Sequence, residues 1–142
     1  MNILTVEGNV VTLAYNPGRE SVEVGDNIAI LDRWDNRGVL VQVIEISVPE
    51  LPGILLEIVR REAASKAPVT HEPQQLTDYK QAVESTKLAR ARIMMEVRRV
   101  DSKLVYERWS GYVPSRNADF RRVSPSEVVR ALRERRLRVG ER

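Results

Sequence analysis

The stretch Ala89-Arg90-Ala91-Arg92-Ile93-Met94-Met95-Glu96-Val97-Arg98 decides the fold of this chain. Small or apolar residues occupy its odd positions, and arginines, Met94 and Glu96 occupy its even positions. Strict alternation over this length predicts a half-buried strand, because successive side chains of a strand point to opposite sides. A helix would spread the arginines around its circumference. We therefore expect Arg90, Arg92 and Arg98 to share the outer face of one strand.

The residues that follow predict the second half of a hairpin. Val100 to Lys103 has the composition of a turn, and Leu104 to Val113 is expected to return as a strand. That strand carries three aromatic residues that favour β-structure: Tyr106, Trp109 and Tyr112. Residues 88–113 therefore predict a hairpin, and residues 114–122 are expected to be an irregular connection.

The first half of the chain predicts further strands at residues 1–15, 27–31 and 39–48. Gly8 interrupts the first of them and predicts a bulge or a bend, which would split it into two strands. Turn-forming sequences separate the segments: Asn16-Pro17-Gly18, Gly25-Asp26 and Asp35-Asn36-Arg37-Gly38. Both faces of the 39–48 strand are mostly apolar, so we expect the barrel interior to cover one face and a helix the other.

Helical patterns occupy three places. Apolar residues at helical spacing predict a helix from about residue 52 to 65, and a shorter helix is expected at 78–85. Ser124, Pro125 and Glu127 form a capping box that starts the last helix, which ends in a basic run of arginines.

These elements favour a mainly β fold, namely a small closed barrel of five or six strands with two to three accessory helices. Closure would remove exposed strand edges. We expect residues 1–123 to form the barrel domain, with the 52–65 helix inserted, and residues 124–142 to form a basic C-terminal helix.

Composition excludes several kinds of chemistry. The 142 residues include no cysteine and a single histidine, His71, so disulfides, thiolate chemistry and multi-histidine metal sites are ruled out. The glycines match neither a Walker A loop nor G-x-G-x-x-G. No signal peptide and no apolar run of about 18 residues is present, so we expect a cytoplasmic protein without membrane contact. The chain is expected not to be an enzyme and to hold no cofactor or metal, and an enzyme with His71 as base is the weaker hypothesis.

Arginines are the candidate binding residues of a chain whose formal charge is +3. They lie on or near the predicted hairpin and the following loop: Arg90, Arg92, Arg98, Arg99, Arg108, Arg116, Arg121 and Arg122. A cluster of guanidinium groups suits phosphates or an acidic partner. The same pattern is also typical of an ordinary solvated sheet face, with Glu96 and Glu107 as cross-strand partners. Nucleic-acid binding would also need exposed aromatics for stacking, and the three aromatics of the hairpin are the candidates.

Several of these segments resemble the N-terminal barrel of HerA-type DNA translocases, the HAS barrel, named for its occurrence in HerA and in rotary ATP synthase subunits. The quoted residues are Gly8-Asn9-Val10 to Asn16-Pro17-Gly18, Val24-Gly25-Asp26-Asn27-Ile28-Ala29-Ile30 and Gly38 to Ile46. Lys87 to Arg92 through Gly111-Tyr112-Val113-Pro114 looks like the second half of that barrel, and Ser124 to Leu132 like the helix that precedes the ATPase domain.

The resemblance implies the barrel of a hexameric ATPase that acts with the nuclease NurA in DNA end processing. The implied partners are the ATPase domain of the same protein, neighbouring subunits of a hexamer, a NurA-type nuclease and DNA. The sequence has no phosphate-binding loop before Arg142, so ATP, magnesium and helicase activity would belong only to a full-length relative. The alternative is a free-standing OB-like barrel that binds nucleic acid through an arginine-rich face.

Overall fold

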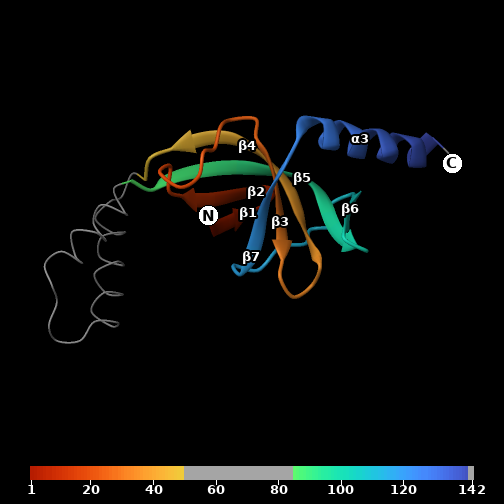
Figure 1. Cartoon of the computed structure of the whole chain (residues 1–142), viewed down its shortest axis with the longest axis horizontal. Coiled ribbons are helices and arrows are strands. Elements are labelled where there is room, and N and C mark those ends of the chain that lie inside the picture. The colour runs from red at the N-terminus through yellow and green to blue at the C-terminus, as the bar shows by residue number, and fades with distance from the viewer. Residues whose placement is uncertain (50–84, 141–142) are drawn as a thin grey trace, which may run out of the picture.

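The computed structural model describes residues 1–49 and 85–140, and for residues 135–140 the backbone alone. The described elements are β1 (Asn2–Glu7), β2 (Val10–Tyr15), β3 (Asn27–Asp32), β4 (Arg37–Ser47), β5 (Lys87–Val100), β6 (Lys103–Glu107), β7 (Ala118–Val123) and α3 (Pro125–Gly140) (Figure 1). The predicted 52–65 helix, the loop with His71 and nearly all of the predicted 78–85 helix lie outside the described residues.

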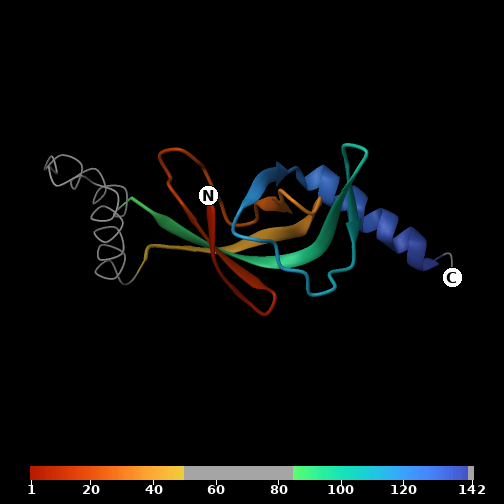
Figure 2. The same cartoon turned by 90° about the horizontal axis from the view of Figure 1, so that it is seen from below.

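The seven described strands form one antiparallel sheet, which confirms the mainly β class. The strand order is β1-β2-β5-β4-β3-β7, and β6 pairs with the far end of β5. β5 has 14 residues and pairs with β4 along one edge and with β2 and then β6 along the other. Figure 2 shows β5 curving along its length, so that the sheet bends around its own interior.

The sheet is not closed, so the predicted closed barrel is not confirmed, and the described strands number seven where five or six were expected. β1 and β7 are the two ends of the strand order. Between them lies a hollow of about 380 Å³, whose lining includes Met1, Glu20 and Phe120. The Met1 amino group donates to the Glu20 carboxylate at 2.8 Å. This hollow and the ion pair of Met1 with Glu20 therefore lie at the seam, where backbone hydrogen bonds between β1 and β7 would be needed to close the barrel.

Glycine and turn signals in the first half of the chain are confirmed. Gly8 has φ +59° in the turn between β1 and β2, so the predicted N-terminal strand is two strands. Gly25 has φ +96°, a conformation that favours glycine. Its N–H donates to the Val43 carbonyl at 2.8 Å, and the Val43 N–H donates to the Asp26 carbonyl at 2.9 Å. The Gly25-Asp26 turn is thus fastened to β4.

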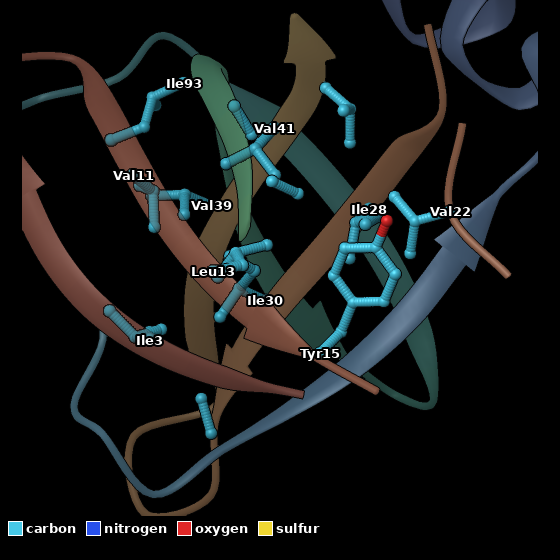
Figure 3. Packing of buried hydrophobic residues seen from close by; sticks show 14 residues of the cluster. Ile3, Val11, Leu13, Tyr15, Val22, Ile28, Ile30, Val39, Val41 and Ile93 are labelled. Atoms are coloured by element: carbon cyan, nitrogen blue, oxygen red, sulfur yellow. The ribbon is translucent and has the colours of Figure 1, made fainter. Parts of the chain in front are cut away.

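Two apolar clusters lie on opposite faces of the sheet. The larger one fills the concave side with Val11, Leu13, Ile30, Val41 and other residues (Figure 3). The smaller one lies under α3 and includes Leu40, Met95 and Ala131. β4 contributes Val39, Val41 and Val43 to the concave cluster and Leu40 to the cluster under α3, whereas Ile44 is 37% exposed. The expected cover of both faces is therefore found at Leu40 and does not extend to Ile44.

A β-bulge at Met94 changes which way the side chains of β5 point. Leu40 pairs with Met95, whereas the next residue of β4, Val41, pairs with Ile93, so Met94 is the extra residue. One extra residue reverses the facing of every residue beyond it. Ala89, Ala91 and Ile93 accordingly join the concave cluster, while Met95 and Val97 join the cluster under α3.

The predicted common face of the arginines is therefore wrong. Arg90 and Arg92 point away from the concave cluster, but Arg98 follows the bulge and shares the concave side with Glu96. The alternation that predicts one face holds only from residue 89 to residue 93.

The chain after the β5–β6 hairpin differs from the prediction in two places. β6 ends at Glu107, so the expected strand to Val113 is too long. The Trp109 indole N–H donates to the Tyr112 carbonyl at 2.8 Å and Gly111 has φ +99°, which turns the chain back on itself. The expected irregular connection is wrong at residues 118–123, because β7 pairs there with β3.

Helix α3 begins as predicted. The Glu127 N–H donates to the Ser124 hydroxyl at 3.3 Å, so Ser124 is the N-cap. Val128 and Ala131 of the first turns pack with Leu104 and Tyr106 of β6, and the helix then extends beyond the sheet (Figure 1). Within the described residues, no helix has the length and apolar character needed to cross a membrane.

Replacing Gly38 by alanine should destabilise the fold strongly. An added methyl group would overlap the Ile30 carbonyl oxygen and come within 2.9 Å of the Leu31 Cα atom, both of them backbone atoms that cannot move aside alone. We expect Gly38→Ala to lower the free energy of unfolding by about 3 kcal/mol in urea titrations. Gly18→Ala is the control, because its methyl group meets only the flexible Asn16 side chain. Equal effects of the two substitutions would contradict this prediction.

Candidate functional site

The eight candidate arginines are distributed over different faces of the molecule. Arg90 and Arg92 lie on the outer face of β5, and Arg98 lies on the concave side. Arg121 stands opposite Ala29, on the α3 side of the sheet, whereas Arg122 stands opposite Ile28, on the concave side. Arg99 lies near the tip of the β5–β6 hairpin, and Arg108 and Arg116 lie in the connection between β6 and β7. The structure does not bring these side chains together on one surface.

Four of these arginines form ion pairs with acidic side chains. The pairs are Arg90–Glu45 at 3.0 Å, Arg98–Glu107 at 3.3 Å, Arg121–Glu127 at 3.9 Å and Arg122–Asp26 at 3.7 Å. In the described part of the chain, Arg92, Arg99, Arg108 and Arg116 have no such pair. Cross-strand partners such as Glu107 favour the interpretation of a solvated sheet face for the arginines that have them.

The three aromatics of the predicted hairpin do not form an exposed stacking platform. Trp109 and Tyr112 pack against the concave cluster, and Tyr106 packs against the cluster under α3. Among the described aromatic residues, the exposed one is Trp34, which has 83% of its surface in solvent and lies in the turn between β3 and β4. Sequence reasoning missed it, although a tryptophan beside a predicted hairpin turn is itself a signal.

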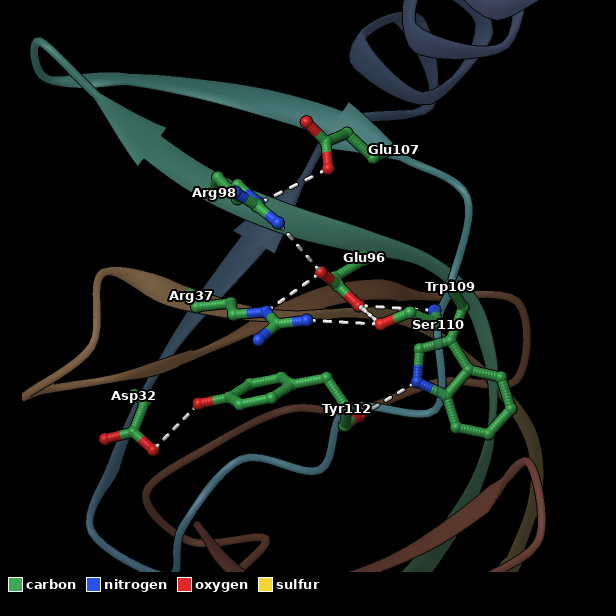
Figure 4. A network of polar contacts seen from close by, with 8 residues as sticks. All are labelled: Asp32, Arg37, Glu96, Arg98, Glu107, Trp109, Ser110 and Tyr112. Atoms are coloured by element: carbon green, nitrogen blue, oxygen red, sulfur yellow. Dashed lines mark hydrogen bonds and ion pairs between the residues drawn. The ribbon is translucent and has the colours of Figure 1, made fainter.

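Glu96 is the centre of a polar network on the concave side (Figure 4). Glu96 is only 1% exposed, yet both of its carboxylate oxygens accept hydrogen bonds. The Arg37 Nε atom donates to one oxygen at 2.9 Å, and the Ser110 hydroxyl and backbone N–H donate to the other at 2.6 and 3.2 Å. Burial raises the pKa of this carboxyl, but the bonds from Arg37 and Ser110 outweigh it, so the pKa lies below its ordinary range. Glu96 is therefore a buried anion at neutral pH.

Arg37 joins Glu96 to the connection between β6 and β7. Its guanidinium also donates to the Ser110 hydroxyl at 3.1 Å and lies 4.3 Å from the centre of the Tyr112 ring, a cation–π contact. The hydrogen bond to Glu96 raises the pKa of Arg37 further. One side chain at the start of β4 thus holds two residues of the connection.

Asp32 provides a second anchor at the end of β3. Its carboxylate accepts from the Ser115 N–H and the Tyr112 hydroxyl at 3.1 Å each, and from the Trp34 N–H at 3.2 Å. The Ser115 bond is the main reason why the pKa of Asp32 is lowered. Burial, reinforced by the bond to Asp32, raises the pKa of Tyr112 to about 12.

The network holds the backbone in place and offers no activated catalytic group. A carboxyl group that acts as a general acid needs a raised pKa, and a carboxylate that acts as a general base must be free to accept a proton from the substrate. Glu96 and Asp32 are both ionised, and their oxygens already accept hydrogen bonds from the chain. No group of three or more acidic or histidine residues that could hold a metal occurs in the stretches 1–49 and 85–134. The network therefore positions the β3–β4 turn and the residues around Tyr112, and with them the exposed Trp34.

Neutralising Glu96 should destabilise the protein in a pH-dependent way. At neutral pH, Glu96→Gln leaves Arg37 and Ser110 without their carboxylate acceptor, and we expect the free energy of unfolding to fall by about 2 kcal/mol. Because the folded-state pKa of Glu96 is depressed, its stabilisation is present above the unfolded pKa of about 4.3 and is lost as the pH falls towards the folded pKa.

Urea unfolding of the two proteins at pH 7 and at about pH 3 measures this difference. The gap between wild type and Glu96→Gln should shrink in acid. The control is Glu45→Gln, which removes an exposed ion pair with Arg90 and should change stability by less than about 1 kcal/mol. A gap that is absent at pH 7, or as large in acid, would show that Glu96 does not stabilise the fold as an anion.

No protein-family model matches the chain, and no curated protein matches its sequence significantly. The likeness to the HerA-type barrel thus rests on the residues quoted for it. The hexamer, the nuclease partner and the lack of catalysis that this likeness implies stay predictions.

Proposed function

We propose that this chain is the non-catalytic N-terminal barrel of a HerA-like hexameric DNA-translocating ATPase. In this proposal it works in the cytoplasm, serves ring assembly and docks a NurA-type nuclease in DNA end processing. The curved sheet would be the HAS barrel, with β1 and β7 on the two sides of its seam. ATP and magnesium would be bound by the ATPase domain and not by these residues.

The exposed Trp34 is the observation that best supports a docking role. Trp34 is 83% exposed, and tryptophan is enriched among the residues that dominate binding energy in interfaces. Asp32 holds the Trp34 backbone and the Ser115 backbone together. A turn that is already ordered loses less conformational entropy on binding.

The quoted family residues also have defined positions in the sheet, which supports the assignment. The Val24-Gly25-Asp26 segment is the turn fastened to β4 through Val43. Gly38 lies where an added side chain would overlap the backbone of β3. Ser124 caps α3, the element that would precede the ATPase domain. These residues shape the sheet and its outgoing helix, as the scaffold of a barrel would require.

The alternative of a free-standing OB-like nucleic-acid binder has less support. It needs one arginine-rich face with exposed aromatics, but the bulge at Met94 divides Arg90 and Arg92 from Arg98. The aromatics of that region are packed against the two clusters. The enzyme hypothesis rests on His71, which lies outside the described residues.

Association with a NurA-type nuclease from the same organism tests the proposal. Sedimentation velocity and titration calorimetry should detect a complex with the wild-type chain. Trp34→Ala should weaken it by roughly 30-fold, the effect of losing an interface hot spot of about 2 kcal/mol. Its melting temperature should stay unchanged, because the side chain is exposed.

Val24→Ala is the matched control, since Val24 is 62% exposed and precedes the opposite end of β3 from Trp34. It should leave the affinity unchanged. Absence of any complex at tens of micromolar wild-type chain would contradict nuclease docking. A complex that is insensitive to Trp34→Ala would place the docking surface elsewhere.

A further inference from the structure

A second surface feature lies between α3 and the β5–β6 hairpin, away from the Glu96 network. It is an open cavity of about 490 Å³, lined by residues of the β5–β6 hairpin, β7 and the first turns of α3. Its lining consists of Ser102, Lys103, Leu104, Tyr106, Arg121, Glu127, Arg130, Ala131 and Glu134. Leu104, Tyr106 and Ala131 belong to the apolar cluster under the helix, and the remaining residues are polar. The cavity thus has both apolar and charged lining residues.

The Tyr106 hydroxyl is the one buried side-chain polar atom without a hydrogen-bond partner among the residues whose side chains are described. Leaving a buried hydroxyl unpaired costs free energy, so such a group in a folded protein requires an explanation. Burial raises the pKa of Tyr106, so the hydroxyl keeps its proton at neutral pH and can donate it to an acceptor. Glu127 and Glu134 line the same cavity, but neither of them accepts a hydrogen bond from this hydroxyl.

Cationic side chains outnumber anionic ones around this cavity. Lys103, Arg121 and Arg130 line it together with Glu127 and Glu134, which leaves one positive charge in excess. The Arg121–Glu127 pair spans 3.9 Å, the long end of an ion pair, so the donors of Arg121 are not fully used by that contact. Glu127 acts electrostatically on the Tyr106 hydroxyl, and Arg121 and Arg130 act on it in the opposite sense. Tyr106 and the two arginines therefore line one cavity, although the hydroxyl itself is closed to water.

We propose that this cavity is a phosphoryl-binding site, in which Arg121, Arg130 and Lys103 hold a phosphate group and the Tyr106 hydroxyl, which is closed to water in this structure, turns to donate to one of its oxygens. A phosphate supplies the acceptor that the hydroxyl lacks and the negative charge that the rim favours. A metal cation would meet three positive side chains. An apolar ligand would leave the hydroxyl unpaired.

The site is independent of the proposed docking role of Trp34. Trp34 lies in the β3–β4 turn, and no residue of the Glu96 network lines this cavity. The phosphate could belong to a small phosphorylated compound or to the backbone of a nucleic acid. Both sources present the same chemical group, and the experiment below distinguishes them.

Nuclear magnetic resonance titration of the whole chain with inorganic phosphate tests the site. The amide signals of Leu104, Tyr106 and Ala131 should shift with saturation, and sodium chloride at equal ionic strength should not reproduce the shifts. Arg130→Gln should weaken binding by about tenfold, because it removes a charge-assisted bond. The matched control is Arg133→Gln on the same helix, since Arg133 does not line the cavity. It should leave the affinity unchanged.

Tyr106→Phe separates binding from folding. It removes a hydroxyl that has no partner, so the melting temperature without phosphate should not fall, while phosphate affinity should drop by about threefold. A single-stranded oligothymidylate that shifts the same signals at lower concentration would identify a nucleic-acid backbone as the source. Response to inorganic phosphate alone would identify a small phosphorylated compound.

Three results would overturn the site. They are the absence of saturable shifts at the cavity residues, equal shifts with chloride, and equal weakening by Arg130→Gln and Arg133→Gln.

Discussion

The extra residue at Met94 is the constraint on which the rest of this structure depends. β5 contributes to two apolar clusters on opposite faces of the sheet, and a strand with strict alternation and one apolar face can serve only one of them. The bulge lies where the second edge of β5 changes its partner from β2 to β6. Before the bulge, Ala91 and Ile93 pack inside the curve of the sheet, and after it Met95 and Val97 pack under α3. One strand thereby joins the concave core to the helix-covered core.

The same reversal places a carboxylate in the interior, and the contacts around it follow from that placement. A buried anion is tolerated only when charged and polar donors surround it. Arg37 supplies the charge from β4, and Ser110 supplies two donors from the connection between β6 and β7. That connection must therefore fold back over the concave side instead of continuing as a strand. Its Tyr112 then reaches Asp32, which also fixes the Trp34 backbone.

The sequence predicted the strands with local signals and missed the features that depend on tertiary context. The turns at Gly8 and Gly25-Asp26 and the cap at Ser124 are where their residue types indicate, because glycine conformations and hydroxyl caps act within a few residues. The turn predicted at Asp35 to Gly38 lies two residues earlier, since β4 begins at Arg37. β7 was missed because Asp119 and Arg121 alternate with Phe120 and Arg122, so neither face is uniformly apolar. Its pairing with β3 is a long-range contact that no local pattern reports.

In the candidate site, too, the sequence predicted the local features and missed those that depend on tertiary contacts. The arginines were correctly identified as exposed, but their common face was wrong because alternation is only informative as long as no residue is inserted. The adjacent pair Met94-Met95, two apolar residues where an arginine was due, was the available signal of the bulge. Glu96 looked like one more solvated charge for the same reason. Neither its burial nor the exposure of Trp34 can be obtained without knowing which segments cross the concave side.

Polar groups on the two sides of the sheet differ in whether other groups of the chain form hydrogen bonds with them. This difference separates the groups that hold the structure together from the group that we propose to contact a ligand. On the concave side, Glu96 has donors at both oxygens and Asp32 has three donors, so these groups are fully used in holding backbone segments together. On the α3 side, Tyr106 stands opposite Val97, and its buried hydroxyl has no partner among the described side chains. A network whose groups are all hydrogen-bonded forms no additional bond with a ligand. In the proposed site, by contrast, a ligand would supply the acceptor that the Tyr106 hydroxyl lacks. The phosphoryl site that we propose therefore lies beside an unmet hydrogen bond, and not at the arginines that the alternation of β5 displays most clearly.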